Sequence, residues 1–370
     1  MRLADLTTLR VGSEISTYIE AASEEEMIAA VRRADDDGAP LLVLGGGSNV
    51  VASDGRFDGV VVRDMRSDMV DMNPNEEGSC CGGAALRVAA GANWDDVVQR
   101  AIAEEWMGIE ALSGIPGTAG ATPIQNVGAY GQEVAESLSS IRVWDRLERR
   151  PRMLALFEME LGYRDSRMKR TLRDAAAGGG RVWGPTGRYV VLDVMFSFRL
   201  ASLSAPIRYA ELARKLDVNV GERVPSAEVR EAVLELRRGK GMVLDASDHD
   251  TWSAGSFFTN PVLSEEAAAA LPLDAPRFEV RDHTAIHQIG GVAPVVEGLV
   301  KTSAAWLIDH AGLHKGHGLP GPAALSSKHV LAITNRGGAS ASDIRALAAE
   351  VQAAVKDAFG VDLVPEPVYL

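Results

Sequence analysis

The chain has 370 residues and a formal net charge of −13 at pH 7, because 51 acidic side chains outnumber 38 Lys and Arg. This acidic balance repels nucleic acid and anionic lipid, so we expect neither as a partner. The length suits two or three domains with their own cores. No apolar run of about 18 residues and no basic-then-apolar leader occurs, so we expect a cytoplasmic protein that does not cross a membrane.

The two cysteines, Cys80 and Cys81, are adjacent in a polar stretch of Gly and Ser. Neighbouring cysteines rarely pair with each other, and two thiolates are too few for a structural zinc cage. A disulfide framework is therefore excluded, and we expect a reducing compartment. We expect the pair to be structurally incidental, with a reactive thiol as the alternative.

The N-terminal part predicts a helix and two strands around a glycine loop. Ser23 is followed by acids at cap spacing, and apolar side chains recur at helical spacing until Gly38 stops the helix. Short apolar runs predict buried strands over 41–44 and 60–62, with GGGSN (45–49) as a tight loop between them. The glycine loop therefore lies between strands.

The glycines of this loop do not follow either of the common nucleotide motifs. A Rossmann fingerprint needs a third glycine three positions after Gly47, where this chain has Val50. A P-loop needs a Lys followed by Ser or Thr, yet Lys240 is followed by Gly241. Both folds are therefore excluded as the explanation of the loop.

A second unit repeats the order of elements. Residues 84–90 predict a strand, Asn93 caps a helix that runs to about Glu105, and 140–145 predict another strand. Before that strand lies SGIPGTAGATPIQNVGAYGQE (113–133), which contains five glycines and no Lys or Arg. Glycines let main chain approach a flat or anionic ligand, so the two glycine loops predict a clasp around one dinucleotide. The alternative is a mobile surface loop.

The C-terminal third is predicted to be α/β. An apolar stripe with matching caps predicts a helix between Ser340 and Gly360. The tail that follows is extended, and Glu366 lies between two prolines that restrict its backbone. Upstream, DAAAGGGRVWGPTGR (174–188) predicts an insertion or flexible hairpin, to which we assign no function.

Ser256 in AGSFFTNP (254–261) lies between a glycine and two phenylalanines, so its hydroxyl would face an apolar, closely approached site. The alternative is a serine that caps a turn while the phenylalanines fill the core. GxSxG is absent, which favours proton donation or hydrogen bonding over acyl transfer. Arg164 in GYRDS (162–166) could equally pair with a surface acid such as Asp165.

Six of the seven histidines fall between His283 and His329, and HAGLHKGH (310–317) has the look of a metal cluster. Glycines within and after it break any helix that would place two ligands on one face, and HExxH is absent. We therefore expect surface or core histidines and no bound metal.

Six motifs in order point to a known family. GGGSN, the 113–133 segment, GYRDS, AGSFFTNP, AAWLID (304–309) and a final PEP-V resemble those of the UDP-N-acetylenolpyruvoylglucosamine reductases over nearly the whole chain. The segment before Lys240 resembles the branch in which a separate tyrosine loop closes over substrate. The resemblance implies an α+β, vanillyl-alcohol-oxidase-type FAD-binding fold of two α/β subdomains and a C-terminal α/β substrate-binding domain. The implied boundaries are 1–75, 76–240 joined by the tail 360–370, and 241–359.

The implied activity is NADPH-dependent, FAD-mediated reduction of the enolpyruvyl ether of UDP-N-acetylglucosamine enolpyruvate to UDP-N-acetylmuramate. This reaction serves peptidoglycan synthesis, and with it cell-wall biogenesis, cell shape and cell division. NADPH and substrate are implied to use one cleft in turn, because no separate NADPH motif is visible. FAD is expected to be non-covalent, since the glycine loops contain no His or Cys. We expect a monomer, because no long helix shows a heptad seam.

The resemblance also carries residue roles. Ser256 matches the proton donor after hydride transfer from flavin N5, and Arg164 and Glu366 match the groups that hold the substrate carboxylate as enolate character develops. The residues implied to contact FAD are Gly46, Gly47, Ser48, Asn49, Ser113, Gly114, Ile115, Pro116, Gly117, Gly120, Gln125, Asn126, Ala129 and Tyr130. The residues implied to bind substrate are Tyr163, Tyr209, Lys240 and Asn260. We rank Arg208, Arg237 and Arg238 lower, as solvated surface charges that could assist.

Two departures from the family pattern concern the substrate end. His310 follows WLID where an amide is common, and Gly241 with Met242 follows Lys240 where an apolar residue and proline are frequent. Two other functions stay open. One is an oxygen-dependent oxidase of the same fold with covalently tethered flavin. The other is a non-catalytic nucleotide-sugar binder, which would lack one of Ser256, Arg164 or Glu366, whereas all three are present.

Overall fold

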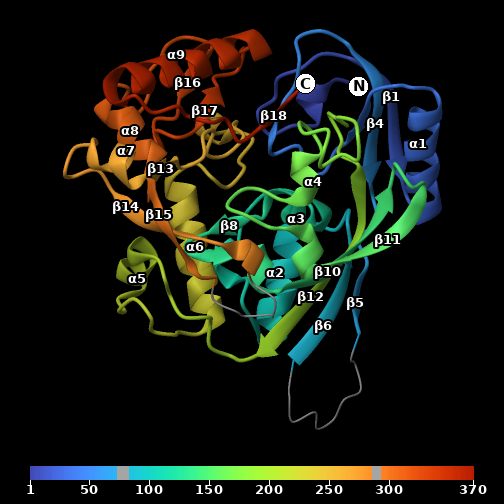
Figure 1. Cartoon of the computed structure of the whole chain (residues 1–370), viewed down its shortest axis with the longest axis horizontal. Coiled ribbons are helices and arrows are strands. Elements are labelled where there is room, and N and C mark those ends of the chain that lie inside the picture. Colours follow the sequence, from blue (N-terminus) through green and yellow to red (C-terminus); the bar gives the residue numbers. More distant parts are fainter. Residues whose placement is uncertain (73–82, 286–292) are drawn as a thin grey trace.

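The computed structural model describes residues 1–72, 83–285 and 293–370. Cys80 and Cys81 lie outside the described residues, as does His287, so the expectation for the cysteine pair stays a prediction. Figure 1 shows the N-terminal sheet at the right, a long antiparallel sheet below, and the C-terminal helices at the upper left. The C-terminal strand runs between these parts.

The first unit is a parallel sheet covered by one helix, as the sequence predicts. Strands β1 (Ile15–Ala21), β4 (Phe57–Asp64) and β2 (Leu41–Val43) lie in that order. Helix α1 (Glu24–Asp36) buries its apolar stripe in the same core as the sheet. The predicted cap forms, because Ser23 Oγ accepts the Glu26 N–H at 3.2 Å. It differs from a reciprocal capping box in one detail: the Glu26 carboxylate accepts the N–H of Ala22 and not that of Ser23.

The second unit is an antiparallel sheet in the order β11-β10-β12-β6-β5, with β7 paired to β12. The predicted strands and the helix capped by Asn93 are confirmed. The elements of this unit are β5 (Met69–Asp71), β6 (Gly83–Ala89), α2 (Trp94–Ala103), β7 (Trp106–Met107), β10 (Leu138–Asp145), β11 (Arg150–Ala155), α4 (Arg167–Arg170) and β12 (Tyr189–Leu200). Helices α5 (Ala210–Leu216) and α6 (Ser226–Gly239) follow and share a smaller core.

Of the two alternatives for 174–188, an insertion or a flexible hairpin, the hairpin is not formed. These residues form successive turns without a strand pair. Arg188, at the end of the segment, donates from Nε to Asp145 Oδ1 of β10 at 2.8 Å. Trp183 is buried and donates from Nε1 to the Gly178 carbonyl at 2.8 Å. Thr186 Oγ1 accepts the N–H of Val43 at 2.7 Å, which ties the segment to the first sheet. Glycine-rich composition suggested a hairpin, but these long-range contacts set the conformation.

The C-terminal third combines an antiparallel sheet, β13-β15-β14, with helices. The predicted long helix is confirmed as α9, because Ser340 and Asp343 form a reciprocal cap and Gly360 ends it at φ 69°. The elements are β13 (Val262–Ser264), α7 (Glu265–Ala269), β14 (Arg277–Arg281), β15 (Val295–Thr302), α8 (Ala304–His310), β16 (Ala323–Leu325), β17 (Ile333–Asn335), α9 (Ala341–Phe359) and β18 (Val368–Tyr369).

The tail reaches two units. We expected it to join 76–240, yet its strand β18 pairs in parallel with β3 (Val50–Val51) of the first unit. The Glu366 side chain contacts the second unit at Gln125 and Arg164. The tail therefore brings its acid to the point where the units meet.

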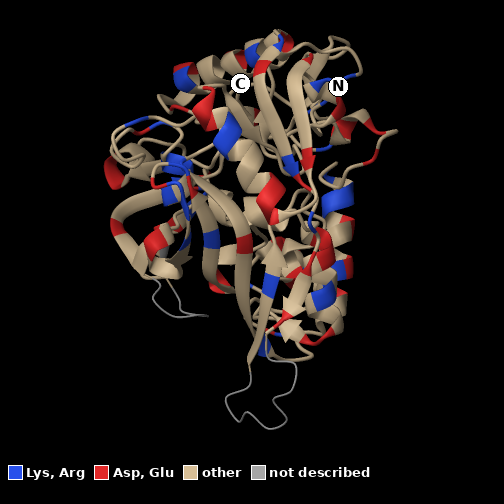
Figure 2. Cartoon of the chain, turned by 90° about the vertical axis from the view of Figure 1, so that its right-hand side faces the viewer, with Lys and Arg blue, Asp and Glu red and all other residues tan. Residues whose placement is uncertain are grey.

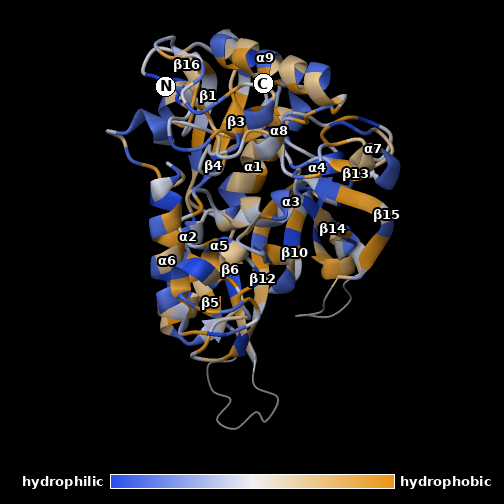
Figure 3. Cartoon of the chain, turned by 90° about the vertical axis from the view of Figure 1, so that its left-hand side faces the viewer, coloured by the Kyte–Doolittle hydropathy of each residue, from blue (hydrophilic) through white to orange (hydrophobic). Residues whose placement is uncertain are grey.

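Acidic and basic residues are interspersed along the chain in the view of Figure 2. Figure 3 shows hydrophobic and hydrophilic residues alternating along α6, whose buried side chains include Val229 and Val233. Among the described residues, no helix is both long and apolar enough to span a membrane.

Candidate active site

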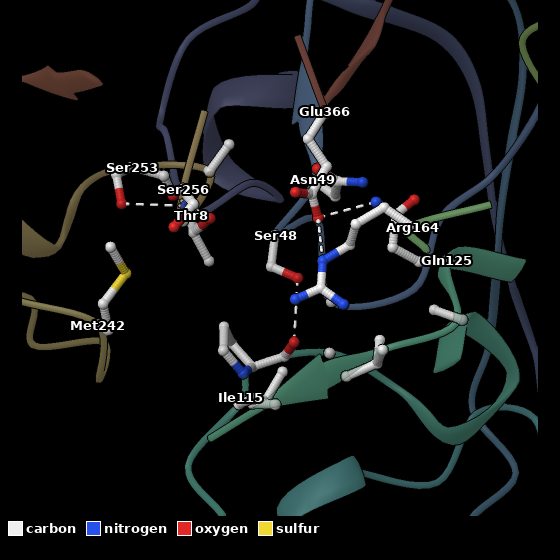
Figure 4. Close-up of a pocket in the computed structure, with 18 of the residues that line it drawn as sticks. Thr8, Ser48, Asn49, Ile115, Gln125, Arg164, Met242, Ser253, Ser256 and Glu366 are labelled. Atoms are coloured by element: carbon white, nitrogen blue, oxygen red, sulfur yellow. Dashed lines mark hydrogen bonds and ion pairs between the residues drawn. The ribbon is translucent and has the colours of Figure 1, made fainter. Parts of the chain in front are cut away.

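A cleft of about 540 Å³ lies where the three units meet, and it collects the predicted motifs. Figure 4 shows Ser256, Arg164 and Glu366 around it, with Ser48, Ile115 and Gln125 from the glycine loops. Most of the predicted FAD residues line it; Ser113, Gly114, Gly120 and Asn126 lie beside it in the same segment. Thr8, Ser253 and His329 also line the cleft, although the sequence provided no reason to expect them there, and so does Met242, which follows Lys240 and Gly241 at the substrate end.

The two glycine loops touch each other and form a cradle that side chains would fill. Ser48 Oγ donates to the Pro116 carbonyl at 3.0 Å. A Cβ on Gly46 would lie 2.6 Å from Gly117 Cα. Gly47 has φ +64°, and a Cβ there would lie 2.1 Å from the Leu6 carbonyl oxygen. Glycine therefore lets these loops pack backbone against backbone, and Gly46, Gly47 and Gly117 line the cleft, as the glycine pattern predicts.

Residues 113–133 form a series of short elements and not one irregular loop. Helix α3 (Thr122–Gln125) is followed by the paired strands β8 (Gly128–Ala129) and β9 (Gln132–Glu133). Asn126, between α3 and β8, has φ 42° and caps the helix in the left-handed conformation. The Asn126 side chain donates to Glu133 Oε2 and to the Gly162 carbonyl, both at 2.9 Å, so it braces the segment from inside.

Replacing Gly47 by alanine should abolish stoichiometric FAD binding. Both Gly47 and Gly38 have φ +64°, so Gly38→Ala is a control with the same backbone strain, and it meets no atom within 4 Å. The expected result is a flavin-to-protein absorbance ratio that falls severalfold in Gly47→Ala and stays at the wild-type value in Gly38→Ala. Equal ratios in both variants would contradict the cradle.

Arg164 is held by main chain of the second glycine loop. Its own φ is 55°, and its guanidinium donates to the carbonyls of Asn126 at 3.3 Å and Gly128 at 2.5 Å. Nε lies 3.5 Å from Glu366 Oε1. Burial works to lower the pKa of Arg164, but the Glu366 carboxylate and other neighbours outweigh it and raise that pKa. The alternative of a pair with Asp165 is not realised, because Asp165 pairs with Arg170.

Ser256 is placed by its neighbours in sequence. Phe257 and Phe258 are fully buried, and Gly255 has φ +73°. The Phe257 carbonyl accepts the Glu366 N–H at 2.9 Å, so the serine segment and the tail are bound together. The phenylalanines fill the core, as the alternative reading expected, while Ser256 lines the cleft. Within the described ranges no hydrogen bond engages its hydroxyl.

The predicted substrate residues lie along the same cleft. The Tyr163 hydroxyl accepts the Asn260 N–H at 3.4 Å, and burial raises the Tyr163 pKa, which keeps the phenol neutral. Tyr209 packs edge-on against Tyr130 with ring centroids 5.7 Å apart. Lys240 Nζ lies 5.6 Å from the Tyr130 ring and bonds to Glu211 at 2.5 Å.

Arg237 is more important than its low ranking suggested. Its Nε is buried without a partner among the described residues, and burial lowers the Arg237 pKa to about 10. Arg208 and Arg238 are exposed, in line with solvated surface charge. The burial of Arg237 could have been predicted from helical spacing, because Arg237 follows the buried Val233 by four residues and so lies on the same face of α6.

The described histidines do not converge. His310 is exposed, stacks on Trp306 and bonds to its carbonyl at 2.9 Å. His329 lines the cleft, and burial lowers its pKa to about 4, so it is neutral near pH 7. No group of three His, Cys, Asp or Glu able to hold a metal occurs in residues 1–72, 83–285 and 293–370.

Two glycine loops that clasp a cleft between α/β units define an FAD-binding flavoprotein, and an FAD-binding domain family matches residues 15–147. The C-terminal domain family of UDP-N-acetylenolpyruvoylglucosamine reductase matches residues 247–370. The chain is 50% identical over 367 residues to the UDP-N-acetylenolpyruvoylglucosamine reductase of Cutibacterium acnes, covering 99% of this chain and 88% of that protein. It is 48% identical to that of Thermobifida fusca, covering 100% and 96%. The chain therefore belongs to the UDP-N-acetylenolpyruvoylglucosamine reductase family of flavin-dependent oxidoreductases.

The fold comparison agrees. The crystal structure of UDP-N-acetylenolpyruvylglucosamine reductase from Thermus caldophilus matches 100% of this chain and 97% of that chain with a TM-score of 0.61 at 22% identity. The predicted fold class is confirmed. The site suits FAD on its own evidence, because main chain lines the cradle and the unpartnered Arg237 Nε offers a donor to an electron-rich ring or a phosphate.

Proposed function

We propose that the protein reduces the enolpyruvyl ether of UDP-N-acetylglucosamine enolpyruvate to UDP-N-acetylmuramate, with NADPH as the electron donor. The observation that carries the proposal is the Arg164–Glu366 ion pair beside Ser256 in a cleft lined by both glycine loops. Bound FAD supplies hydride chemistry at its N5 position. The residues of the chain then have to bind the substrate, stabilise charge and deliver one proton.

Arg164 and Glu366 would hold the substrate carboxylate. Hydride addition to an alkene conjugated to a carboxylate builds negative charge on the carboxylate oxygens, and a preorganised cation stabilises that charge. Ser256 would donate its proton to the alkene carbon that does not receive the hydride, because its hydroxyl is free of protein partners in the described chain. Tyr209, Lys240 and Asn260 would hold the diphosphate and uridine end.

NADPH and substrate would occupy the cleft in turn, since one cavity of about 540 Å³ collects the flavin and substrate residues. High substrate should therefore inhibit NADPH oxidation competitively, and a purely uncompetitive pattern would favour two sites. The division at 1–75, 76–240 and 241–359, a monomeric state and a cytoplasmic location belong to the same proposal.

The test is the visible spectrum of the purified protein. We expect a flavin spectrum that NADPH bleaches without oxygen and that the enolpyruvyl substrate restores at one equivalent per flavin. Bleaching without restoration by substrate would contradict the proposed function. Yellow colour that stays with acid-precipitated protein would contradict non-covalent FAD and favour the oxidase alternative.

A further inference from the structure

Gln125 is the last residue of α3, in the second glycine loop, and its side chain points at Glu366 in the C-terminal tail (Figure 4). Its Nε2 donates to Glu366 Oε1 at 2.8 Å. We infer that Gln125 is a positioning residue, which turns the Glu366 carboxylate so that Oε1 meets Arg164 and Oε2 is left for the ligand. The inference rests on the proposed function of Glu366 and deepens it.

The lengths of the two contacts decide which one orients the carboxylate. Arg164 Nε lies 3.5 Å from Oε1, which exceeds the roughly 3.2 Å of a well-formed N–H···O bond. The terminal torsion of a glutamate is broad, so a contact of that length leaves the carboxylate free to turn. The Gln125 bond is short and directional. Gln125 therefore sets the orientation that the ion pair alone does not.

The main chain of Glu366 is fixed separately, which leaves only its side chain to be positioned. Its N–H donates to the Phe257 carbonyl at 2.9 Å, and Pro365 pairs with Phe258 as an isolated bridge. Without Gln125 the backbone would stay in place while the carboxylate turned to place both oxygens on the Arg164 guanidinium. That rearrangement would remove the oxygen that faces the ligand.

Oε2 of Glu366 is available to a ligand. The Gln125 hydrogen bond and the shortest Arg164 contact both reach Oε1, Lys169 interacts electrostatically with the carboxylate, and no hydrogen bond from residues 1–72, 83–285 or 293–370 reaches Oε2. The residue lines the cleft. A neutral amide suits the position of Gln125, because it can donate a hydrogen bond to the carboxylate, whereas an acid would repel it.

One loop thus holds both charged groups. The Gln125 side chain holds Glu366, and the carbonyls of Asn126 and Gly128 hold Arg164. A flavin bound against this loop and a substrate carboxylate bound by the pair would share one rigid support. This arrangement would fix the distance and orientation between the flavin, which donates the hydride, and the Arg164–Glu366 pair, which stabilises the developing charge.

The test is a double-mutant cycle on flavin reoxidation by substrate, measured by rapid mixing. Gln125→Ala should slow reoxidation by about 10- to 100-fold in the wild-type background, the range for a lost bond to a charged group. In the Glu366→Ala background the same change should alter the rate by less than about 2-fold, because the carboxylate that accepts the Gln125 hydrogen bond is gone. Gln352→Ala is the matched control, since the Gln352 amide donates to the tail at the Leu363 carbonyl and not to Glu366.

The competing outcome is that Gln125 acts by contacting FAD. FAD affinity of the apoprotein, measured by quenching of flavin fluorescence, should be unchanged in Gln125→Ala. Weaker FAD binding, or an equal loss of rate in both backgrounds, would overturn the inference while the proposed function stands. A wild-type protein that substrate does not reoxidise would overturn the proposed function and this inference with it.

Discussion

Ser256→Ala should leave reduction of the flavin by NADPH nearly unchanged and slow its reoxidation by substrate by about two to four orders of magnitude, the range for a lost general acid. The two half-reactions separate because only reoxidation consumes a proton at carbon. The backbone should not move, since buried Phe257 and Phe258 hold this segment and no described residue bonds to the hydroxyl that is removed. Rapid mixing of each half-reaction provides the measurement.

Ser247→Ala is the control for this experiment. Ser247 is an exposed serine whose Oγ donates to Asp245 in a surface turn, so its loss should change neither half-reaction. Equal slowing of both half-reactions in Ser256→Ala would assign the serine to ligand placement. Serine is a weak acid in water, so its donation depends on a strongly basic carbon and on exclusion of solvent.

Local patterns predicted the elements whose causes are local. The cap at Ser23, the cap at Asn93 and the left-handed end at Gly360 each involve neighbours a few residues apart, and all three are confirmed. The glycines of the first loop were also predictable, because their sequence alone indicates exposed main chain. Such signals are set by backbone geometry within one turn.

Contacts between distant segments were not predictable from local sequence. The hairpin expected at 174–188 fails because Thr186 bonds to Val43, more than a hundred residues away. The tail pairs with β3, which no local pattern in its last residues reveals. From the sequence, Arg237 was predicted to be a surface charge, but the packing of α6 buries its Nε.

The family resemblance assigned roles to Arg164 and Ser256 that their local sequence left open. Arg164 could have paired with a surface acid, and Ser256 could have been a turn cap. Their convergence with Glu366 depends on three segments more than ninety residues apart, which only the tertiary structure brings together. Arg164 offers the sharpest test of the roles proposed for these residues.

Arg164→Lys should slow reoxidation by substrate by about 10²- to 10³-fold, as for loss of one preorganised donor to developing negative charge. Lysine keeps the positive charge and is as disfavoured as arginine at the φ of 55° found for Arg164, so the comparison isolates the head group. A guanidinium reaches Asn126 O, Gly128 O and Glu366 at once and still has N–H groups for the substrate. A lysine ammonium has three donors on one atom and cannot span these positions.

Arg173→Lys is the matched control, since Arg173 is exposed and lines a neighbouring cavity but not the cleft itself. It should leave both half-reactions within about 2-fold of the wild type, in keeping with the small effects of surface charges. A wild-type rate in Arg164→Lys would mean that positive charge alone suffices. The main-chain carbonyls that bind the guanidinium would then serve folding, and charge stabilisation would not require the geometry of the Arg164–Glu366 pair.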